Sequence, residues 1–253
     1  MNPVLEVSRL KKVFRSEGKS DFTALDDVSF SVYPGEIFGI IGESGSGKST
    51  LAKSVMRMID LTEGTVSVCG EDVTRLKGKE LRSIYRKMQM VFQSPAGSFD
   101  PRRTLGYGIS ESLKNAGLSK EERQRKVTEL LKLCGLTGEF AKRYPHQVSG
   151  GECQRAAIAR ALAISPEIII FDEATSALDV TVQQGIMELL TSLNAEHQLT
   201  YLFICHNLAL VQSFCDRIIV MKNGKIVETG ETDAVIRNPQ SEYTKRLLDV
   251  CLI

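Results

Sequence analysis

Eight consecutive residues, Gly42 to Ser49, follow the pattern G-x-x-x-x-G-K-S without a mismatch. In such a loop, successive backbone N–H groups turn inward around a phosphate, and glycine permits the backbone dihedrals that this requires. Lys48 is suited to bridge the β- and γ-phosphates, and the Ser49 hydroxyl is suited to ligate Mg²⁺. The residues predicted to contact ATP here are Gly42, Glu43, Ser44, Gly45, Ser46, Gly47, Lys48, Ser49 and Thr50, with Thr50 at the α-phosphate.

A pair of carboxylates forms the second candidate element for chemistry. Asp172 and Glu173 directly follow the apolar run 168–171. Asp172, at the end of a predicted strand, is suited to hold Mg²⁺ through its water shell, and Glu173 to orient or deprotonate an attacking water. Two adjacent acids after a strand are usually an ordinary loop beginning. Their pairing with the glycine-rich loop instead favours ATP hydrolysis.

The loop needs a strand before it and a helix after it, and the sequence predicts both. Residues 37–41 are a short continuous apolar run, typical of a strand covered on both faces. Residues 48–58 carry Leu51, Val55 and Met58 at helical spacing. This context disfavours the alternative that the loop is a glycine-rich turn matching the pattern by chance.

Strands and helices are predicted to alternate along the rest of the chain, which indicates an α/β protein. Ser119 and Glu122 form a capping-box pattern that starts a helix, with Gly135 as its end. Asn223-Gly224 predicts a tight hairpin. Further strands are predicted over 5–10, 28–32, 168–171, 201–204 and 217–221, and further helices over 149–164 and in the tail, 232–248.

The composition excludes several classes of protein. The 253 residues have a net charge of +1, which offers no overall electrostatic signal for nucleic acid. No window approaches the roughly 18 apolar residues of a membrane-spanning helix, so we expect a soluble chain. The six cysteines lack the spacing of a metal or disulfide site and are predicted to be reduced.

The segment from Ser149 to Glu152 reads S-G-G-E, and here the sequence resembles the ABC ATPase family, whose signature is close to L-S-G-G-Q. Val148 and Glu152 depart from that pattern, whereas Ser149, Gly150 and Gly151 match it. The resemblance implies that these four residues, Ser149 to Glu152, contact the γ-phosphate of ATP bound to another subunit. It also implies that two such subunits close head to tail around two MgATP molecules.

Other motifs of the family follow in the expected order. Gln93 resembles the glutamine that senses Mg²⁺, and His206 the histidine that hydrogen-bonds the γ-phosphate. Asp179, in the segment Ser176-Ala177-Leu178-Asp179, resembles the residue of the loop that crosses the dimer interface. The resemblance thus assigns Lys48, Gln93, Glu173 and His206 to catalysis, and Ser49, Gln93 and Asp172 to Mg²⁺.

The family also implies an architecture. We expect a P-loop NTPase (RecA-like) ABC ATPase core with an N-terminal antiparallel β subdomain and an inserted α-helical subdomain. The whole chain, 1–253, is predicted to be one domain, with core 1–94 and 163–230, helical subdomain 95–162 and tail 231–253. An aromatic residue stacks on adenine in this family, and Phe14 is our choice, with Phe22 as the alternative. Phe14 as a plain core residue also stays open.

A narrower resemblance joins residues 94–104 and 238–248 to the ATPases of peptide and nickel importers. It implies a peripheral subunit at the cytoplasmic face of the cell membrane. Expected partners are two transmembrane permease subunits, a second, paralogous ABC ATPase and, indirectly, an extracytoplasmic substrate-binding protein. Because the sequence ends at Ile253, without the longer extension of many peptide members, we lean towards nickel or a metal chelate over peptide as cargo.

Three alternatives remain to be weighed. A soluble ABC ATPase acting on nucleic acid or ribosomes is disfavoured by the short interval between Ser49 and Asp172, which leaves no room for long coiled coils. A P-loop kinase or GTPase would leave Ser149 to Glu152 unexplained. A regulatory subunit without turnover is disfavoured because Glu173 and His206 are both present.

Overall fold

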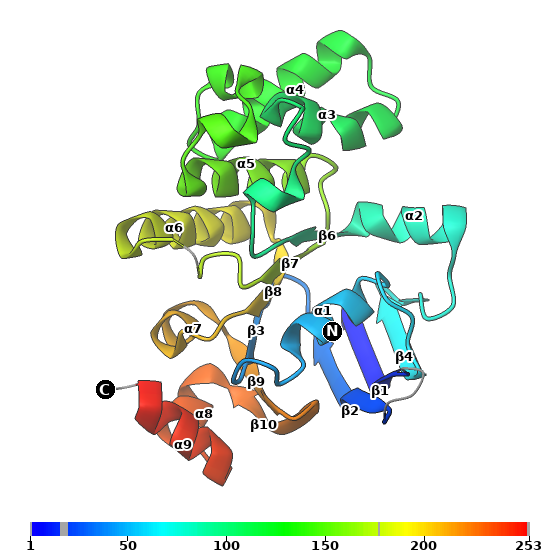
Figure 1. Ribbon diagram of the computed structural model, residues 1–253, viewed down its shortest axis with the longest axis vertical. Coiled ribbons are helices and arrows are strands. Elements are labelled where there is room, and N and C mark those ends of the chain that lie inside the picture. Colours follow the sequence, from blue (N-terminus) through cyan, green and yellow to red (C-terminus); the bar gives the residue numbers. More distant parts are fainter. Residues whose placement is uncertain (1, 16–19, 177, 252–253) are drawn as a thin grey trace.

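Two β-sheets and a group of helices make up the computed structural model, which describes residues 2–15, 20–176 and 178–251 (Figure 1). The strands are β1 (Leu5–Phe14), β2 (Phe22–Val32), β3 (Ile37–Ile41), β4 (Glu63–Val68), β5 (Glu71–Asp72), β6 (Met88–Val91), β7 (Ile168–Asp172), β8 (Thr200–Ile204), β9 (Arg217–Lys222) and β10 (Lys225–Glu231). The helices are α1 (Lys48–Val55), α2 (Gly78–Lys87), α3 (Leu105–Asn115), α4 (Lys120–Leu133), α5 (Gly150–Leu162), α6 (Val180–His197), α7 (Leu208–Phe214), α8 (Thr232–Arg237) and α9 (Glu242–Cys251). The expected α/β class is therefore confirmed.

The larger sheet has the strand order β10-β9-β3-β8-β7-β6 and is parallel except for β10. Its strands β6, β7, β8 and β3 are neighbours, so their carboxyl ends meet at one edge. Strands β3, β7 and β8 are buried along their whole length. Helices and the second sheet cover both faces, which explains the continuous apolar runs in the sequence.

The side chains of the larger sheet divide between two hydrophobic cores. On β7, Ile169 and Phe171 join the core formed with α3–α6, whereas Ile168 and Ile170 join the core formed with α1 and the smaller sheet. This alternation follows from the pleat, which points successive side chains to opposite faces. The central sheet is thus held from both sides, and the strand ends that carry polar residues are fixed.

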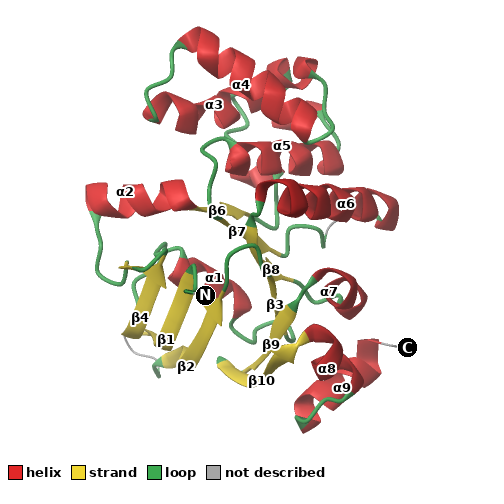
Figure 2. Cartoon of the chain, turned by 180° about the vertical axis from the view of Figure 1, so that it is seen from behind, coloured by secondary structure: helices red, strands yellow, loops and turns green. Residues whose placement is uncertain are grey.

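The smaller sheet is antiparallel, with the order β2-β1-β4-β5, and lies beside α1 (Figures 1 and 2). Helices α3, α4 and α5 form a separate group at the top of Figure 1, on the far side of the larger sheet. These two groups are the antiparallel and helical parts expected of the fold. The exact limits of the subdomains, 95–162 for the helical one, stay a prediction.

Local rules account for the ends of several elements. The Ser119 hydroxyl accepts a hydrogen bond from the Glu122 N–H at 3.2 Å, and the Glu122 carboxylate accepts one from the Ser119 N–H at 2.8 Å, which confirms the capping box that starts α4. Asn223 and Gly224 have φ of 49° and 76°, as the tight hairpin between β9 and β10 requires.

Several predicted boundaries were wrong. The first strand runs to Phe14, not to residue 10, because it stays paired with β2 as far as Phe22. The helix after the glycine-rich loop ends at Val55, not at residue 58, because Arg57 adopts a left-handed backbone with φ of 56°. Its guanidinium donates to the Val73 and Ile59 carbonyls, so tertiary contacts hold it there. The second strand also begins at Phe22, six residues earlier than predicted, because pairing with β1 extends it.

Among the residues that the structure describes, no helix combines the length and the apolar character needed to cross a bilayer. The five cysteines whose side chains are described are free thiols: Cys69, Cys134, Cys153, Cys205 and Cys215.

Candidate nucleotide-binding site

The glycine-rich loop connects β3 to α1, as the pattern requires. Gly42 has φ of 147° and Gly47 φ of 106°, both in the region that disfavours side chains. A Cβ at Gly42 would overlap the Met221 carbonyl oxygen, and one at Gly47 would lie 2.8 Å from the Ala24 carbonyl oxygen. Glycine is therefore needed at these two positions for space as well as for conformation. The loop thus packs against β9 at Met221 and against β2 at Ala24.

Lys48 is held inside this loop. Its Nζ donates to the carbonyl oxygens of Gly42 and Glu43 at 2.7 and 2.8 Å. Burial lowers its pKa, and the nearby carboxylates of Glu173 and Asp172 oppose that shift. Two of the three ammonium hydrogens are thus used by the loop, and the third is available to an anion seated on it.

Ser49 and Asp172 form a pair of oxygen ligands beside the loop. The Ser49 hydroxyl donates to Asp172 Oδ1 at 2.8 Å, although 123 residues separate the two. Asp172 is only 7% exposed, and its pKa is raised by burial and, more weakly, by the charge of Glu173. A buried carboxylate with a hydroxyl partner is the chemistry that a hard divalent cation prefers. These residues therefore fit Mg²⁺.

The surroundings suit magnesium better than a metal held by protein alone. Over the described ranges, no group of three or more His, Cys, Asp or Glu side chains could enclose a metal ion. Mg²⁺ usually keeps several waters and takes only one or two protein ligands together with phosphate oxygens. The sparse ligand set at Ser49 and Asp172 matches that requirement.

Glu173 lies at the centre of a second cluster, built from three neighbouring strand ends. Gln93 Nε2, after β6, donates to Glu173 Oε2 at 3.1 Å. His206 Nδ1, after β8, lies 3.8 Å from the same oxygen. Glu173 itself has a left-handed backbone with φ of 49°, and its N–H donates to the Ile204 carbonyl oxygen at 3.1 Å. One carboxylate oxygen thus faces an amide and an imidazole at the edge of the loop.

A cavity of about 360 Å³ lies over the loop and includes Gln93 and Glu173 of this cluster. Its lining residues are Phe22, Ala24, Ser44, Gly45, Gly47, Lys48, Ser49, Thr50, Gln93 and Glu173. The cavity therefore combines backbone donors, the Lys48 ammonium group, the Ser49 hydroxyl that donates to Asp172, and the Gln93–Glu173 pair. Such a combination can bind a nucleoside triphosphate and activate a water at its far end.

The aromatic residue at this cavity differs from our first choice. Phe22 lines it, whereas Phe14 does not. The two are opposite each other across the β1–β2 pair, but β2 is the strand against which Gly47 packs, at Ala24. Phe22 is 63% exposed and available for stacking, while Lys12 Nζ lies 4.9 Å from the centre of the Phe14 ring. Of the two candidates for stacking on adenine, only Phe22 is therefore at the cavity.

Ser149, Gly150, Gly151 and Glu152 lie at the start of α5 and do not line this cavity. The Ser149 hydroxyl accepts from the Glu152 N–H at 3.3 Å, and the Glu152 carboxylate accepts from the Ser149 N–H at 2.7 Å. These bonds lower the pKa of Glu152. Ser149 and Gly150 are exposed. Within one chain, this segment is therefore not brought to the loop.

Asp179 belongs with this segment rather than with the loop. Its Oδ1 accepts from the Val182 N–H at 2.9 Å and caps α6. A Cβ at Gly151 would overlap Val182, so the starts of α5 and α6 are in close contact. Ala177, in the same predicted motif, lies outside the described residues.

Tyr243 is a residue of the site that the sequence analysis missed. Its hydroxyl, on α9, accepts a hydrogen bond from the Glu43 N–H at 3.2 Å. Lys222 Nζ lies 4.7 Å from the centre of its ring. The C-terminal helix thus touches the glycine-rich loop across 200 residues of sequence, and no local pattern predicts such a contact.

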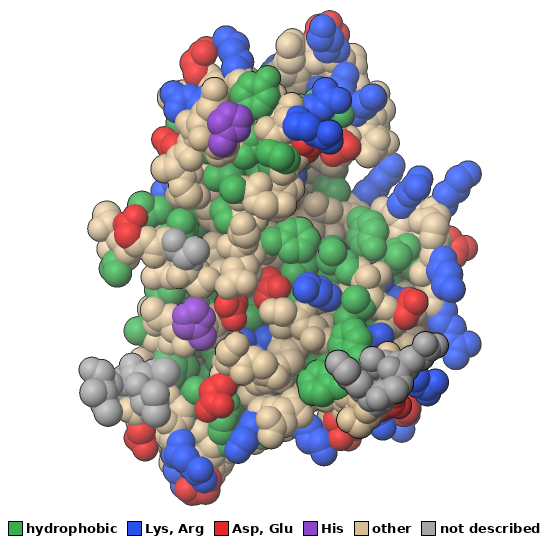
Figure 3. Space-filling model, in the orientation of Figure 1, with side chains coloured by type: hydrophobic (Ala, Val, Ile, Leu, Met, Phe, Trp, Pro, Cys, Tyr) green, Lys and Arg blue, Asp and Glu red, His purple; other side chains and the backbone are tan. Residues whose placement is uncertain are grey.

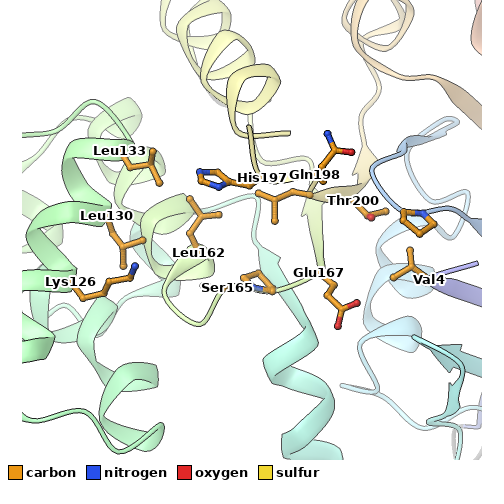
Figure 4. A pocket seen from close by; sticks show the side chains of 13 residues that line it. Val4, Lys126, Leu130, Leu133, Leu162, Ser165, Glu167, His197, Gln198 and Thr200 are labelled. Carbon is orange, nitrogen blue, oxygen red and sulfur yellow. The ribbon is translucent and has the colours of Figure 1, made fainter. Parts of the chain in front are cut away.

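A separate cavity of about 430 Å³ lies elsewhere, lined by α4, the end of α5 and the segment between α6 and β8 (Figure 4). Its walls include Leu130, Leu162 and Leu199, with Lys126 and His197 at the same opening. It contains none of the residues predicted to bind nucleotide or magnesium. We therefore assign the chemistry to the smaller cavity over the loop.

Known proteins with similar sequences are ATP-binding proteins of transporters. The family model described as "ABC transporter" matches residues 25–176. The chain is 47% identical to the oligopeptide transport ATP-binding protein OppF of Bacillus subtilis (strain 168) over 248 residues, covering 97% of this chain and 81% of that protein. It is 43% identical to the dipeptide transport ATP-binding protein DppF of Lactococcus lactis subsp. cremoris (strain MG1363), covering 97% and 80%.

Solved structures show the same fold. A dimeric structure of the ATP-binding cassette MJ0796, in a post-hydrolysis state bound to ADP and Pi, superposes with a TM-score of 0.83 at 34% identity. The match covers 90% of this chain and 98% of that one. CbiO1 of Clostridium perfringens, part of the transporter complex cbiONQ, has a TM-score of 0.81 at 25% identity over the full length of both chains.

Proposed function

This chain belongs to the ABC transporter family, and on that premise we propose that it is the ATP-hydrolysing subunit of an importer for oligopeptides or dipeptides. The observation that carries the enzymatic part is the contact of Glu173 with Gln93 and His206, beside the Ser49–Asp172 pair. Gln93, Glu173 and His206 follow three adjacent strands, and Ser49, Gln93 and Glu173 line one cavity at that edge, which is where open α/β sheets bind their ligands.

The proposed cofactors are ATP and Mg²⁺. Ser49, Asp172 and Gln93 would hold the ion, and Phe22 would stack on adenine. The ion, when bound, would neutralise charge on the β- and γ-phosphates. The loop N–H groups and Lys48 would hold the phosphates in place, so the chain itself orients the nucleotide for in-line attack.

The chemical step would depend on Glu173. Its Oε2 already accepts a hydrogen bond from Gln93 and is near His206. There it can accept one from a water and hold it opposite the leaving oxygen, taking up its proton as the bond forms. His206 is 58% exposed at its side chain, so it is free to reach the γ-phosphate. Preorganised donors of this kind act without reorganising at the moment of reaction.

We propose that a full site needs two subunits. The exposed Ser149 and Gly150 lie away from the cavity of their own chain, where they can donate to a γ-phosphate on a second subunit. Asp179, next to this segment, would cross the same interface. The dimer of the similar cassette supports this arrangement. The second subunit is proposed to be a paralogous ABC ATPase.

The remaining partners and the cargo are proposed from the similarity of this chain to transporter subunits. Two transmembrane permease subunits would carry the cargo across the cell membrane, and this chain would lie at its cytoplasmic face; an extracytoplasmic substrate-binding protein would act indirectly. The relatives reported above are named for oligopeptide and dipeptide transport, and none of them for nickel. We therefore set aside the preference for nickel or a metal chelate and propose peptide.

The test is a pair of variants in the reconstituted complex. Glu173→Gln should retain ATP binding while turnover falls by a factor of about 10²–10⁴, the usual contribution of a general base. Lys48→Ala should weaken ATP binding itself. Unchanged turnover in Glu173→Gln would remove that residue from its proposed role. Failure of peptide to stimulate the wild-type complex, with stimulation by a nickel chelate, would overturn the cargo.

A further inference from the structure

Helix α2 and the residue before it carry a group of exposed cations: Lys77, Lys79, Arg82 and Arg86. We call this group the basic flank. In Figure 3, Lys and Arg side chains gather along the right-hand edge of the molecule, where Figure 1 places α2. The whole chain has a net charge of only +1, so the basic flank is a local concentration and not a consequence of a basic composition.

The helix presents these cations in one direction. At 3.6 residues per turn, positions 79, 82 and 86 fall within about 60° of one another around the axis. Ile84, on the other side, is fully buried, and Tyr85 packs against the same core. This anchored inner side fixes the rotation of α2, so Lys79, Arg82 and Arg86 point outward together.

The basic flank has no counter-charge within the described part of the chain. None of its four cations lies within 4.0 Å of a carboxylate, whereas Lys87, further round the helix, pairs with Glu71 at 3.2 Å. Glu80 is the single acid in α2, about 100° round the axis from Lys79. Exposed cations are usually interleaved with acids, as on α4. Four exposed, unpaired cations, three of them on one side of α2, favour an anionic partner outside the chain.

We infer that the basic flank contacts the anionic headgroups of the membrane. A row of long, flexible cations without an enclosing pocket fits a planar array of phosphates better than a single small anion. The part of α2 that the structure describes carries no large exposed apolar side chain, so the contact is electrostatic and does not insert into the bilayer. The near-neutral chain argues against nucleic acid. This inference rests on the proposed function, which places the chain at the surface of a membrane.

The experiment measures binding of the full chain to phosphatidylcholine vesicles with and without phosphatidylglycerol, by co-sedimentation. Wild type should bind only the anionic vesicles and dissociate in about 1 M salt, where the Debye length is about 3 Å. The triple variant Lys79→Gln, Arg82→Gln, Arg86→Gln should bind on the order of 100-fold more weakly, because each cation near an anionic surface contributes about 1 kcal/mol and 1.4 kcal/mol is tenfold.

A matched control removes the same number of charges from α4: Lys120→Gln, Arg123→Gln, Arg125→Gln. Its affinity for anionic vesicles should stay within a few-fold of wild type. Equal losses of vesicle affinity in both triple variants would overturn the inference. So would wild-type binding that is equally strong with and without phosphatidylglycerol. If the wild type bound a DNA duplex as tightly as anionic vesicles, the basic flank would be a general polyanion-binding surface, and the inference of a lipid partner would be wrong.

ATP turnover is measured separately, without vesicles. The basic flank contributes nothing to the nucleotide cavity, so the α2 triple variant should keep wild-type turnover. Lost lipid binding with intact turnover, in the variant alone, supports the inference. This assay includes the paralogous ATPase, because the proposed site needs two subunits. Absent turnover with the wild-type chain in that mixture would count against the proposed function and leave the vesicle result to be judged by itself.

Discussion

The two glycines at the start of α5 should respond differently to the same substitution. A Cβ at Gly151 would overlap Val182 of α6, whereas a Cβ at Gly150 would lie 3.4 Å from Leu178, an ordinary contact. Neither glycine has a positive φ, so alanine introduces no backbone strain at either position. Gly150→Ala is therefore the matched control for Gly151→Ala.

The expected magnitudes follow from this geometry. Overpacking a well-filled contact lowers the free energy of unfolding by about 1–3 kcal/mol. Replacing glycine by alanine in a helix raises it by at most about 1 kcal/mol. Gly151→Ala should therefore lower the free energy of unfolding by about 1–2 kcal/mol, which is roughly 2–8 °C in Tm for a chain of this size. Gly150→Ala should be neutral or slightly stabilising. Both should lose ATP turnover if this segment completes the site of a partner subunit.

Thermal and urea unfolding, followed by circular dichroism, check the stabilities, and steady-state ATPase assays check the activity. Adding Val182→Ala to Gly151→Ala removes the obstructing methyl groups and should recover about 1 kcal/mol or more as a coupling energy. Equal stability of the two glycine variants would refute the reasoning. So would a double variant no more stable than Gly151→Ala alone.

Three further substitutions test the nucleotide cavity. Asp172→Asn should abolish Mg²⁺-dependent stabilisation by ATP yet make the nucleotide-free protein more stable at pH 7, because burial raises the pKa of Asp172 and its ionised form disfavours folding. That gain should disappear below the unfolded-state pKa, about 4, where both states are protonated; a gain that persists there would contradict this origin. Phe22→Ala should weaken ATP binding about tenfold, as loss of a stacked ring costs roughly 1–3 kcal/mol, while Phe14→Ala should not; isothermal titration distinguishes them. Tyr243→Phe leaves the Glu43 N–H without its partner and should weaken ATP binding several-fold in the same titration, because a neutral hydrogen bond contributes about 1 kcal/mol; unchanged affinity would show that the loop keeps its shape without α9.

Much of the fold could be predicted because local chemistry determines it. The capping box of α4, the hairpin at Asn223-Gly224 and the buried strand 37–41 each depend on residues a few positions apart. The glycine-rich loop belongs to the same class, since a backbone that surrounds phosphate needs glycine at set spacings. Each of these was visible in the sequence before any tertiary contact was known.

Other features depended on which strands are neighbours. Gln93 and Glu173 meet across 80 residues, and Ser49 and Asp172 across 123, because β6, β7, β8 and β3 are adjacent in one sheet. The family resemblance placed these residues in one site, but residue spacing alone did not. The end of α1 at Val55 was likewise set in part by the hydrogen bond of Arg57 to the Val73 carbonyl oxygen, 16 residues away.

The sequence by itself determined that this chain cradles phosphate, since the pattern from Gly42 to Ser49 encodes the loop conformation directly. Only the tertiary structure decided that Phe22 and not Phe14 lines the cavity, that Tyr243 contacts the loop, and that Ser149 does not line the cavity of its own chain. The physical reason is the distance along the sequence over which each interaction acts. Dihedral preferences and caps act over a few residues, whereas sheet order and packing of the tail are set by the burial of surfaces far apart in sequence.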